Sequence, residues 1–339
     1  MDLTERAGPA RMDGMKVGFR SLLEQRPGPA WSAVFQAGWP GWRRWFLERG
    51  GAQAPSLDDA TRALRRFMPE MERLWSGLVE AVASDEDAAR FLSFWTPPRY
   101  LIQCSQAVLV DDDGPILVRN YDLAPELNEG TVLRTRWRSR DVMGMVDALS
   151  GLADGMNDAG LAVSLTFGGR TVVGKGFGAP MIVRYLLEVC SDAQQAVEAL
   201  RAIPCHMAYN VTVMDRHGRG ETVFLSPDRP AIVTGKPFTT NHQVGVEWPR
   251  HGRLSRTVER ADALEKILAN RKLDGDSLTA AFLQPPLLAT SYAEGFGTVY
   301  TAAYRPAEGA MTLLWPGQPE RRWTFQDYKQ IEFEVSYPD

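Results

Sequence analysis

The first hundred residues place apolar side chains at helical spacing. Over residues 57–83, large apolar side chains recur every three or four positions with Arg and Glu between them. This pattern predicts a helix that Pro69 should kink or split, because proline lacks an N–H and clashes with the preceding turn. A short helix is expected to begin at Ser84–Glu86 and to end before Pro97. We therefore predict that the chain opens with an all-helical segment of about 100 residues.

After Pro98 the spacing of apolar residues changes from a helical to a β-strand pattern. Two β-rich runs at 104–110 and 115–121 flank Asp111-Asp112-Asp113-Gly114, which is typical of a hairpin. Strand-like runs follow at 160–167, 209–215, 221–226, 231–234, 298–304 and 310–315, and helical patterns at 181–189, 193–200, 256–269 and 277–282. Because the strands outnumber the helices and come in hairpins, we predict an α+β fold of mostly antiparallel sheets with helices packed on them.

Composition excludes several classes of function. The 339 residues carry 38 basic and 42 acidic side chains, a net charge of −4, without the concentrated basic surface that a nucleic-acid partner would need. No apolar stretch reaches the ~20 residues of a membrane span, and the N-terminus has no apolar secretory segment. Three cysteines are too few for a disulfide framework, so we expect a cytoplasmic protein. With only four histidines in the sequence, few residues could act as the base in Ser-His or Cys-His catalysis.

Two other candidate sites carry little weight. The glycine-rich run Gly174–Gly178 could cradle a phosphate, but it lies among hairpins rather than in a βαβ unit, so a loop near a pocket is the stronger interpretation. Cys190, Cys205, His206 and His251 lack metal-ligand spacing, and we expect buried structural residues there and no metal site.

Cys104 lies where the helical pattern gives way to the β pattern. A turn centred near residues 112–113 would place Cys104 opposite Tyr121, with Arg119 and Asp122 beside it at the open end of the hairpin. A slip of one residue would change which side chains share a face. Arg119 is expected to lower the pKa of the thiol, and the thiolate is the nucleophilic form. The alternative is a buried, inert cysteine beside an ordinary Arg–Asp pair.

A family resemblance favours the catalytic interpretation. The stretch from Cys104 through Gly114 to Arg119-Asn120-Tyr121-Asp122 resembles the start of the mature N-terminal-nucleophile (Ntn) hydrolases that cleave linear amides. These include choloylglycine hydrolases, penicillin V acylases and acid-ceramidase-like enzymes, and the chain most resembles the acyl-coenzyme A:6-aminopenicillanate acyltransferase family. Asn157–Val163 is similar to that family's Asn-x-x-Gly-Leu turn and strand, and Thr239-Thr240-Asn241-His242 to its Thr-Asn-His segment.

The resemblance implies a fold and a set of roles. The fold would be an αββα four-layer sandwich over residues 104–339, preceded by a prosegment over 1–103 that is expected to stay bound after cleavage. Cys104 would be the nucleophile, Arg119 and Asp122 would assist it, and Asn241 would give an oxyanion contact from its side-chain N–H. A backbone N–H near Thr166 would be a second donor, and Arg253 or Arg256 would match a family arginine in substrate binding. Gln103 stands where the penicillin acyltransferase has glycine.

The implied chemistry needs no cofactor. Cys104 would attack the carbonyl of Gln103, and hydrolysis of the resulting thioester would free an α-amine that can act as the general base. The enzyme would then cleave, or transfer the acyl group of, a small N-acyl amide or acyl-thioester. One alternative is a non-catalytic ligand-binding or interaction protein on the same fold, with an unprocessed chain. Another is a papain-type peptidase, for which His242 is the candidate base.

Overall fold

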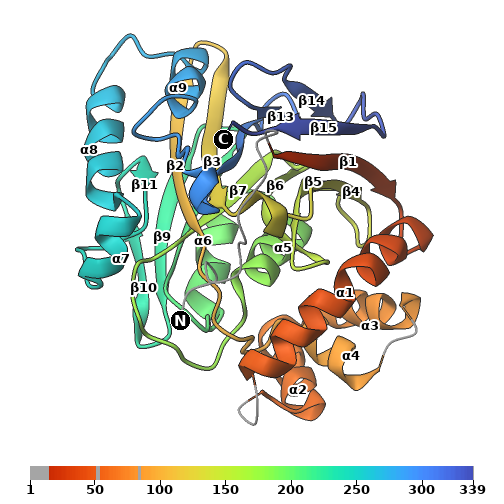
Figure 1. Ribbon diagram of the computed structural model, residues 1–339. Helices are drawn as coiled ribbons and strands as arrows, with labels where there is room; N and C mark the ends of the chain where they lie inside the picture. Colours follow the sequence, from red (N-terminus) through yellow and green to blue (C-terminus); the bar gives the residue numbers. More distant parts are fainter. Residues whose placement is uncertain (1–14, 51–53, 83–84, 339) are drawn as a thin grey trace.

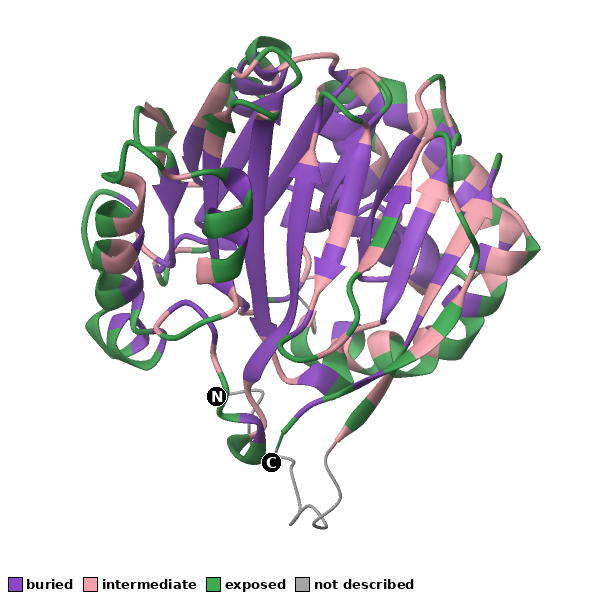
Figure 2. Cartoon of the chain, turned by 90° about the horizontal axis from the view of Figure 1, so that it is seen from above, coloured by how far each residue is buried: buried purple, intermediate pink, exposed green. Residues whose placement is uncertain are grey.

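Two β-sheets lie face to face between two layers of helices (Figure 1). The computed structural model describes residues 15–338 except 51–53 and 83–84. The strands that face each other between the sheets are buried along most of their length, whereas the helices on the outside expose one side (Figure 2). This architecture confirms the predicted four-layer sandwich of mostly antiparallel sheets.

The larger sheet has nine strands. Their spatial order is β10 (Arg229–Thr234), β9 (Gly220–Ser226), β8 (Tyr209–Asp215), β7 (Leu161–Phe167), β6 (Gly151–Asn157), β5 (Val142–Asp147), β4 (Thr131–Thr135), β1 (Lys16–Glu24) and β15 (Glu332–Ser336). Helices α5 (Ala179–Val189) and α6 (Ala193–Ala202) cover its outer face. Every residue of β5 to β8 is buried, polar ones included, so these strands are covered on both faces.

The smaller sheet has six strands. Their order is β11 (Phe238–Thr239), β2 (Gln103–Asp111), β3 (Gly114–Leu123), β12 (Gly297–Arg305), β13 (Ala310–Leu314) and β14 (Arg321–Thr324). Helices α8 (Thr257–Leu268) and α9 (Gly275–Phe282) cover its outer face, and the short α7 (Pro249–Leu254) leads into α8. The strands predicted at 104–110, 115–121, 298–304 and 310–315 and the helices predicted at 256–269 and 277–282 are confirmed, with ends that differ by one or two residues, whereas β11, β14 and α7 were not predicted.

The β2–β3 hairpin has the predicted register. Cys104 pairs with Tyr121, and Gln106 with Arg119. Gln106 donates to Thr212 of β8 at 2.7 Å, so this face of the hairpin points into the space between the sheets. Because successive side chains alternate between faces, Arg119 shares the inner face with Cys104 and Tyr121, whereas Asp122 lies on the face toward the outer helices.

The N-terminal segment is helical over most of its length but begins with a strand. Its helices are α1 (Pro29–Gly50), α2 (Leu57–Phe67), α3 (Glu72–Ala81) and α4 (Glu86–Leu92). Pro69 splits the predicted helix 57–83 as expected, and a short 3₁₀ turn over Pro69–Met71 separates α2 from α3. Ala83, Ser84 and the first fourteen residues, to which the signal-peptide argument applies, lie outside the described residues.

Strand β1 corrects the prediction of an all-helical segment. It pairs parallel to β4 and antiparallel to β15, so it fills a place inside the larger sheet. Phe19 stacks on Phe333 at 5.6 Å and meets the edge of Trp315 at 5.3 Å. Glu24 at its end accepts hydrogen bonds from the backbone N–H groups of Gly28 and Ala30, which begin α1. The strand depends on partners from the far end of the chain, which local periodicity does not reveal.

Two predicted loop features have a structural explanation. Asn157 holds the β6–β7 turn by accepting from Leu161 N and donating to the carbonyls of Leu187 and Cys190. Gly176 lies so close to Cys205 that an added Cβ would be 2.2 Å from the Cys205 carbonyl carbon, so the glycine-rich run Gly174–Gly178 allows close backbone packing.

In the part of the chain that the structure describes, no helix combines the length and apolar character needed to cross a membrane.

Candidate active site

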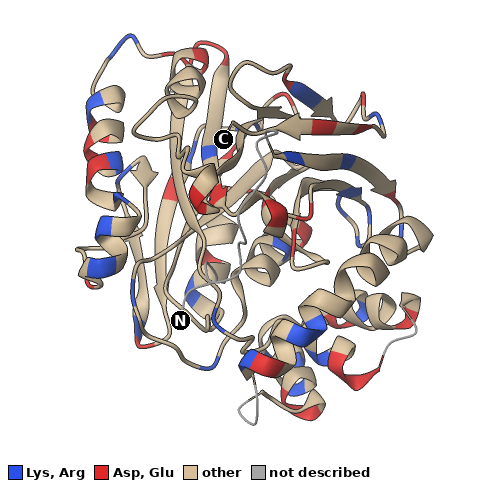
Figure 3. Cartoon of the chain, viewed as in Figure 1, with Lys and Arg blue, Asp and Glu red and all other residues tan. Residues whose placement is uncertain are grey.

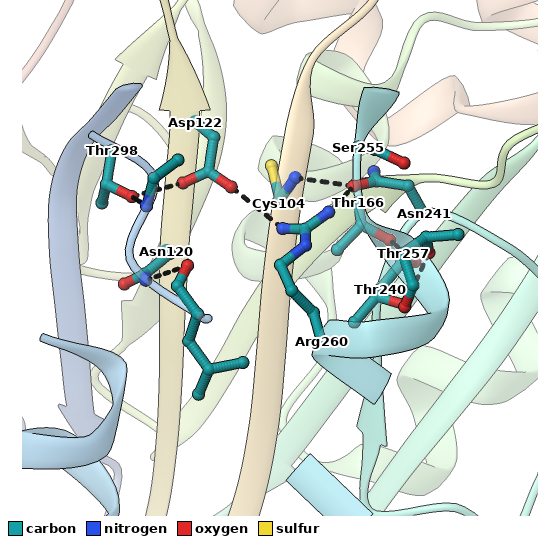
Figure 4. Close-up of polar contacts among 12 residues, drawn as sticks. Cys104, Asn120, Asp122, Thr166, Thr240, Asn241, Ser255, Thr257, Arg260 and Thr298 are labelled. Carbon is teal, nitrogen blue, oxygen red and sulfur yellow. Dashed lines mark hydrogen bonds and ion pairs between the residues drawn. The ribbon is translucent and has the colours of Figure 1, made fainter. Parts of the chain in front are cut away.

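Cys104 is the second residue of strand β2, on the inner face of the hairpin, and is fully buried, with 0% of its surface exposed. Its Sγ accepts a hydrogen bond from Arg119 Nη2 at 2.9 Å. Its backbone N–H donates to Asn241 Oδ1 at 3.1 Å (Figure 4). The thiol and the main-chain nitrogen of one residue therefore each have a defined polar partner.

A buried network fixes the Arg119 guanidinium. Its Nη1 donates to Asp154 Oδ2 and to the Ala153 carbonyl, both at 2.6 Å. Asp154 also accepts from the Tyr300 hydroxyl at 2.7 Å and from that of Tyr304. Arg119 is itself fully buried. A buried, paired guanidinium can aim a fixed positive charge at the sulfur.

Burial dominates the acidity of the thiol in the intact chain. It raises the pKa of Cys104 to about 11; Arg119 opposes this shift, the Asp122 charge adds to it, and the Asp122 backbone N–H opposes it weakly. Arg119 thus lowers the pKa of the thiol, as expected. The net pKa is nevertheless raised, so the expectation of an acidic thiol is wrong. The free-energy cost of taking the thiolate out of water is larger here than its favourable interaction with the Arg119 guanidinium.

Asp122 is held on the other face of β3. Its Oδ2 accepts from Arg260 Nη1 at 3.0 Å and its Oδ1 from the Thr298 hydroxyl at 2.7 Å (Figure 4). Burial raises the pKa of Asp122, while Arg260, Thr298 and Arg119 oppose that shift. Asp122 is therefore linked to Cys104 through Arg260 and Asn241 in the unprocessed chain.

Asn241 bridges the nucleophile and the larger sheet. Its Oδ1 accepts from Arg260 Nη2 at 2.5 Å as well as from Cys104 N, while its Nδ2 donates to the Phe167 carbonyl at 3.1 Å. One of the two N–H donors of this side chain is thus engaged with the backbone. Thr166 is also buried beside this region, and its hydroxyl donates to the Thr240 carbonyl at 3.0 Å.

A third arginine, rather than Arg253 or Arg256, lies in the buried network around Cys104. Arg253 and Arg256 are both exposed, and Arg256 pairs with Glu259 on the surface. Arg260, which the sequence analysis missed, is buried and touches both Asp122 and Asn241. The signal was present, because Thr257, Arg260 and Leu264 follow one another at helical spacing on the buried face of α8.

The remaining histidines and cysteines have other partners. His242 Nδ1 lies 2.9 Å from the Thr257 hydroxyl, and burial lowers its pKa. His206 Nδ1 lies 2.8 Å from the Tyr209 hydroxyl. Burial raises the pKa of Cys190 and of Cys205 to about 12. Among the residues that the structure describes, no group of three His, Cys, Asp or Glu side chains is arranged to hold a metal ion.

One family model matches the chain. The family described as acyl-coenzyme A:6-aminopenicillanic acid acyl-transferase matches residues 109–320, more than half of the chain. No curated protein sequence matches the chain.

Solved structures provide further similarities, all at low identity. A mutant conjugated bile acid hydrolase from Clostridium perfringens is 13% identical at a TM-score of 0.48, covering 69% of this chain and 97% of its own. The Caenorhabditis elegans ortholog of N-acylethanolamine-hydrolyzing acid amidase is 17% identical at 0.43, covering 60% and 93%. Penicillin V acylase from Agrobacterium tumefaciens is 12% identical at 0.45, covering 66% and 86%.

Proposed function

Because the chain belongs to the acyl-coenzyme A:6-aminopenicillanic acid acyl-transferase family, we propose that it is a self-processing cysteine amidohydrolase or acyltransferase. Its substrate is a small N-acyl amide or an acyl-thioester, and the acyl group passes through a thioester on Cys104. The observation that carries this proposal is the pair of contacts at Cys104, from Arg119 to the sulfur and from the main-chain nitrogen to Asn241. The family match begins five residues after Cys104, and the hairpin pairing joins Cys104 to the matched region.

Self-processing begins at the peptide bond between Gln103 and Cys104. The Cys104 sulfur attacks the Gln103 carbonyl, the C–N bond breaks, and the nitrogen takes up the proton that the thiol gives up. Water then hydrolyses the thioester to a Gln103 carboxylate and the free thiol. The products are residues 1–103 and a chain that begins at Cys104 with a free α-amine.

The new α-amine supplies the base that a histidine-poor chain otherwise lacks. Its reference pKa of ~7.7–8.0 suits proton transfer near neutral pH. Asn241 Oδ1 already accepts from this nitrogen, so we assign Asn241 to orienting the amine. Asn241 Nδ2 carries two hydrogens, and only one of them is donated to the Phe167 carbonyl, so the second supplies the oxyanion contact. Asp122 balances the ammonium form, and Arg119 stabilises the thiolate.

The N-terminal fragment stays bound after cleavage in this proposal. Strand β1 occupies a place between β4 and β15, and Trp31 of α1 donates its indole N–H to the Leu149 carbonyl at 2.8 Å. Basic and acidic residues are interspersed over the elements (Figure 3), which fits a small-molecule substrate better than nucleic acid.

Intact-mass spectrometry under denaturing conditions tests this proposal. The wild-type chain should appear as residues 1–103 and 104–339, and Cys104→Ala as one chain. Cys190→Ala and Cys205→Ala are matched controls, because both cysteines are buried and should process normally. A wild-type chain that stays whole, yet hydrolyses N-acyl amides, would defeat the mechanism based on a terminal amine.

A further inference from the structure

Three buried polar atoms near the nucleophile have no hydrogen-bond partner among the described residues. They are the Tyr100 hydroxyl oxygen, Asp147 Oδ2 and Arg119 Nε. The Asp147 side chain belongs to a residue that is only 7% exposed, and Arg119 is fully buried. Buried polar groups are almost always paired in folded proteins, because an unpaired one keeps the full free-energy cost of leaving water. Three such atoms in one region therefore call for a functional explanation.

Asp147 and Arg119 belong to the end of the sandwich that holds Cys104. Arg119 donates to the Cys104 sulfur through Nη2, and its guanidinium carbon lies 4.9 Å from the centroid of the Tyr121 ring. Burial raises the pKa of Asp147 to about 7, and Arg119 is the charged group that most opposes the shift. Burial also raises the pKa of Tyr121, and Asp147 adds most to that shift. The Asp147 carboxyl is therefore within electrostatic range of the two side chains beside the sulfur.

Tyr100 reaches the same region in the intact chain. Burial raises the pKa of its hydroxyl, and Asp147, Tyr121 and Cys104 are among the groups that add to the shift. Its ring also meets the edge of Trp45 of α1 at 6.3 Å. The Tyr100 hydroxyl and Asp147 Oδ2 are near enough for their charges to interact, yet they form no hydrogen bond with each other. Tyr100 thus lies near the carboxyl without pairing with it.

The position of Tyr100 in the chain identifies the part of a substrate that can reach Asp147. Tyr100 lies four residues before Cys104, a span of at most about 14 Å when extended. In self-processing it therefore belongs to the acyl group that moves onto the Cys104 sulfur. In turnover, the acyl group of the substrate forms a thioester on the same sulfur. Once the segment before Cys104 has withdrawn, this acyl group can take the place of the Tyr100 side chain.

The two unpaired atoms that remain after cleavage differ in kind. Asp147 Oδ2 can only accept a hydrogen bond when the carboxyl is ionised, and Arg119 Nε can only donate one. A hydroxyl group donates and accepts, so it can pair with either atom. An ammonium group would be repelled by the Arg119 guanidinium and a carboxylate by Asp147, and burying either charge costs more free energy than burying a hydroxyl. The site therefore favours an uncharged acyl group that carries a hydroxyl.

We propose that Asp147 is a specificity-determining residue that accepts a hydrogen bond from a hydroxyl group on the acyl part of the substrate, at a site that the Tyr100 side chain occupies until the Gln103–Cys104 bond is cleaved. This inference rests on the proposed function and adds the chemistry of its acyl group. It also explains why the chain keeps a buried carboxyl oxygen that is unpaired, since such an atom lowers stability unless a ligand pairs with it.

The kinetic test uses two amides of the same amine, the N-[3-(4-hydroxyphenyl)propanoyl] amide and the N-(3-phenylpropanoyl) amide. They differ only in the hydroxyl group, and the first carries the side chain of tyrosine. We expect the processed wild-type protein to prefer the hydroxylated amide by about tenfold or more in kcat/KM, and Asp147→Ala to lose this preference. Asp147→Asn, which keeps an acceptor oxygen, should retain part of it. Because the preference is a ratio measured on one preparation, it does not depend on how much of a variant folds.

Asp215→Asn is the matched control for the kinetic test. Asp215 is also a buried carboxyl at the last residue of a strand of the larger sheet, and it accepts from the backbone N–H of Ala193 at 3.1 Å. Its variant should keep the wild-type preference for the hydroxylated amide. A wild-type protein without this preference, or a preference that survives in Asp147→Ala, would overturn the inference.

A binding test that needs no cleavage separates this inference from the proposed function. In Cys104→Ala/Tyr100→Gly the chain stays whole and the tyrosine side chain is absent. In calorimetric titrations, 4-methylphenol, which has the shape of that side chain, should bind about tenfold or more tightly than toluene, and adding Asp147→Ala should remove the difference. This binding, in a protein whose wild type hydrolyses no amide, would overturn the proposed function and support the hydroxyl site. Equal affinities for 4-methylphenol and toluene would overturn the inference.

Discussion

Arg260 Nη1 lies 3.0 Å from Asp122 Oδ2, and this buried ion pair joins helix α8 to the end of strand β3. Both side chains are almost fully removed from solvent. Removing one partner of such a pair leaves an unpaired charge in the interior, whereas removing both charges often restores much of the stability. The pair therefore offers a way to separate folding from function.

We expect Arg260→Met to lower the free energy of unfolding by about 3–5 kcal/mol. Adding Asp122→Asn should recover part of that stability without restoring self-cleavage, because Asn241, which accepts from the Cys104 N–H, still lacks its Arg260 contact. Urea unfolding and intact-mass spectrometry on the two variants measure both effects. Arg256→Met is the control, since its exposed pair with Glu259 should contribute less than about 1 kcal/mol. Full processing in the double variant would contradict the role given to Arg260.

Strand β1 predicts that the two products of cleavage stay together. Under native conditions they should elute as one species in size-exclusion chromatography and separate only in denaturant, because β1 has a strand paired on each side. Phe19→Ala should destabilise the assembly by about 3–5 kcal/mol, since it leaves a cavity beside Trp315 and Phe333. Two separate native peaks in the wild type would show that the sheet does not hold the N-terminal fragment.

The features that sequence alone could predict are those set by neighbours along the chain. The hairpin register follows from one turn, so Cys104 opposite Tyr121 could be placed by arithmetic. The contact between Arg260 and Asp122 could not be predicted in this way, because the two residues are 138 positions apart and only the packing of α8 brings them together. Strand β1 was missed for the same reason, since Lys16 pairs with Ser336. The net acidity of Cys104 also depends on burial, which the sequence shows only in outline.

Asn241→Ala should slow turnover by about 10²-fold, with the larger effect on kcat. The variant loses the oxygen that accepts from Cys104 N, so the amine is no longer held beside the thiol. Steady-state kinetics on an N-acyl amide provide the measurement. Gln243→Ala is a useful control, because Gln243 is buried two residues away and donates to backbone carbonyls of the larger sheet. A change confined to KM would instead indicate that Asn241 binds the ground state.

A buried carboxyl near the N-terminal helices should make stability depend on pH. Burial raises the pKa of Asp147 to about 7, and Asp154 adds to the shift while Arg119 opposes it. A carboxyl with a folded-state pKa above its unfolded value of ~3.9 favours the folded state when protonated, so stability is lost as the pH rises from about 4 to about 7.

Asp147→Asn should remove this dependence, and its thermal midpoint should fall less than that of the wild type between pH 5 and pH 8. Glu126→Gln, at an exposed position, is the control. Differential scanning fluorimetry at several pH values provides the comparison. If the thermal midpoints of the wild type and Asp147→Asn changed with pH in parallel, Asp147 would not titrate in this range.

The raised pKa of the Cys104 thiol predicts how fast the precursor cleaves itself. With a pKa of about 11, the thiolate fraction grows tenfold for each pH unit through the neutral range. A precursor refolded at pH 5.5 should accumulate uncleaved, and after a jump to pH 6–9 its cleavage rate should rise about tenfold per unit. The cleaved fraction is followed over time on denaturing gels.

Arg119→Lys should keep a cation near the sulfur but lose the paired geometry with Asp154. Its cleavage should therefore be slower at every pH, with the same increase in rate per pH unit. A rate that is flat between pH 6 and 9 would mean that the attacking sulfur is already a thiolate in the folded precursor, and that Arg119 outweighs burial after all.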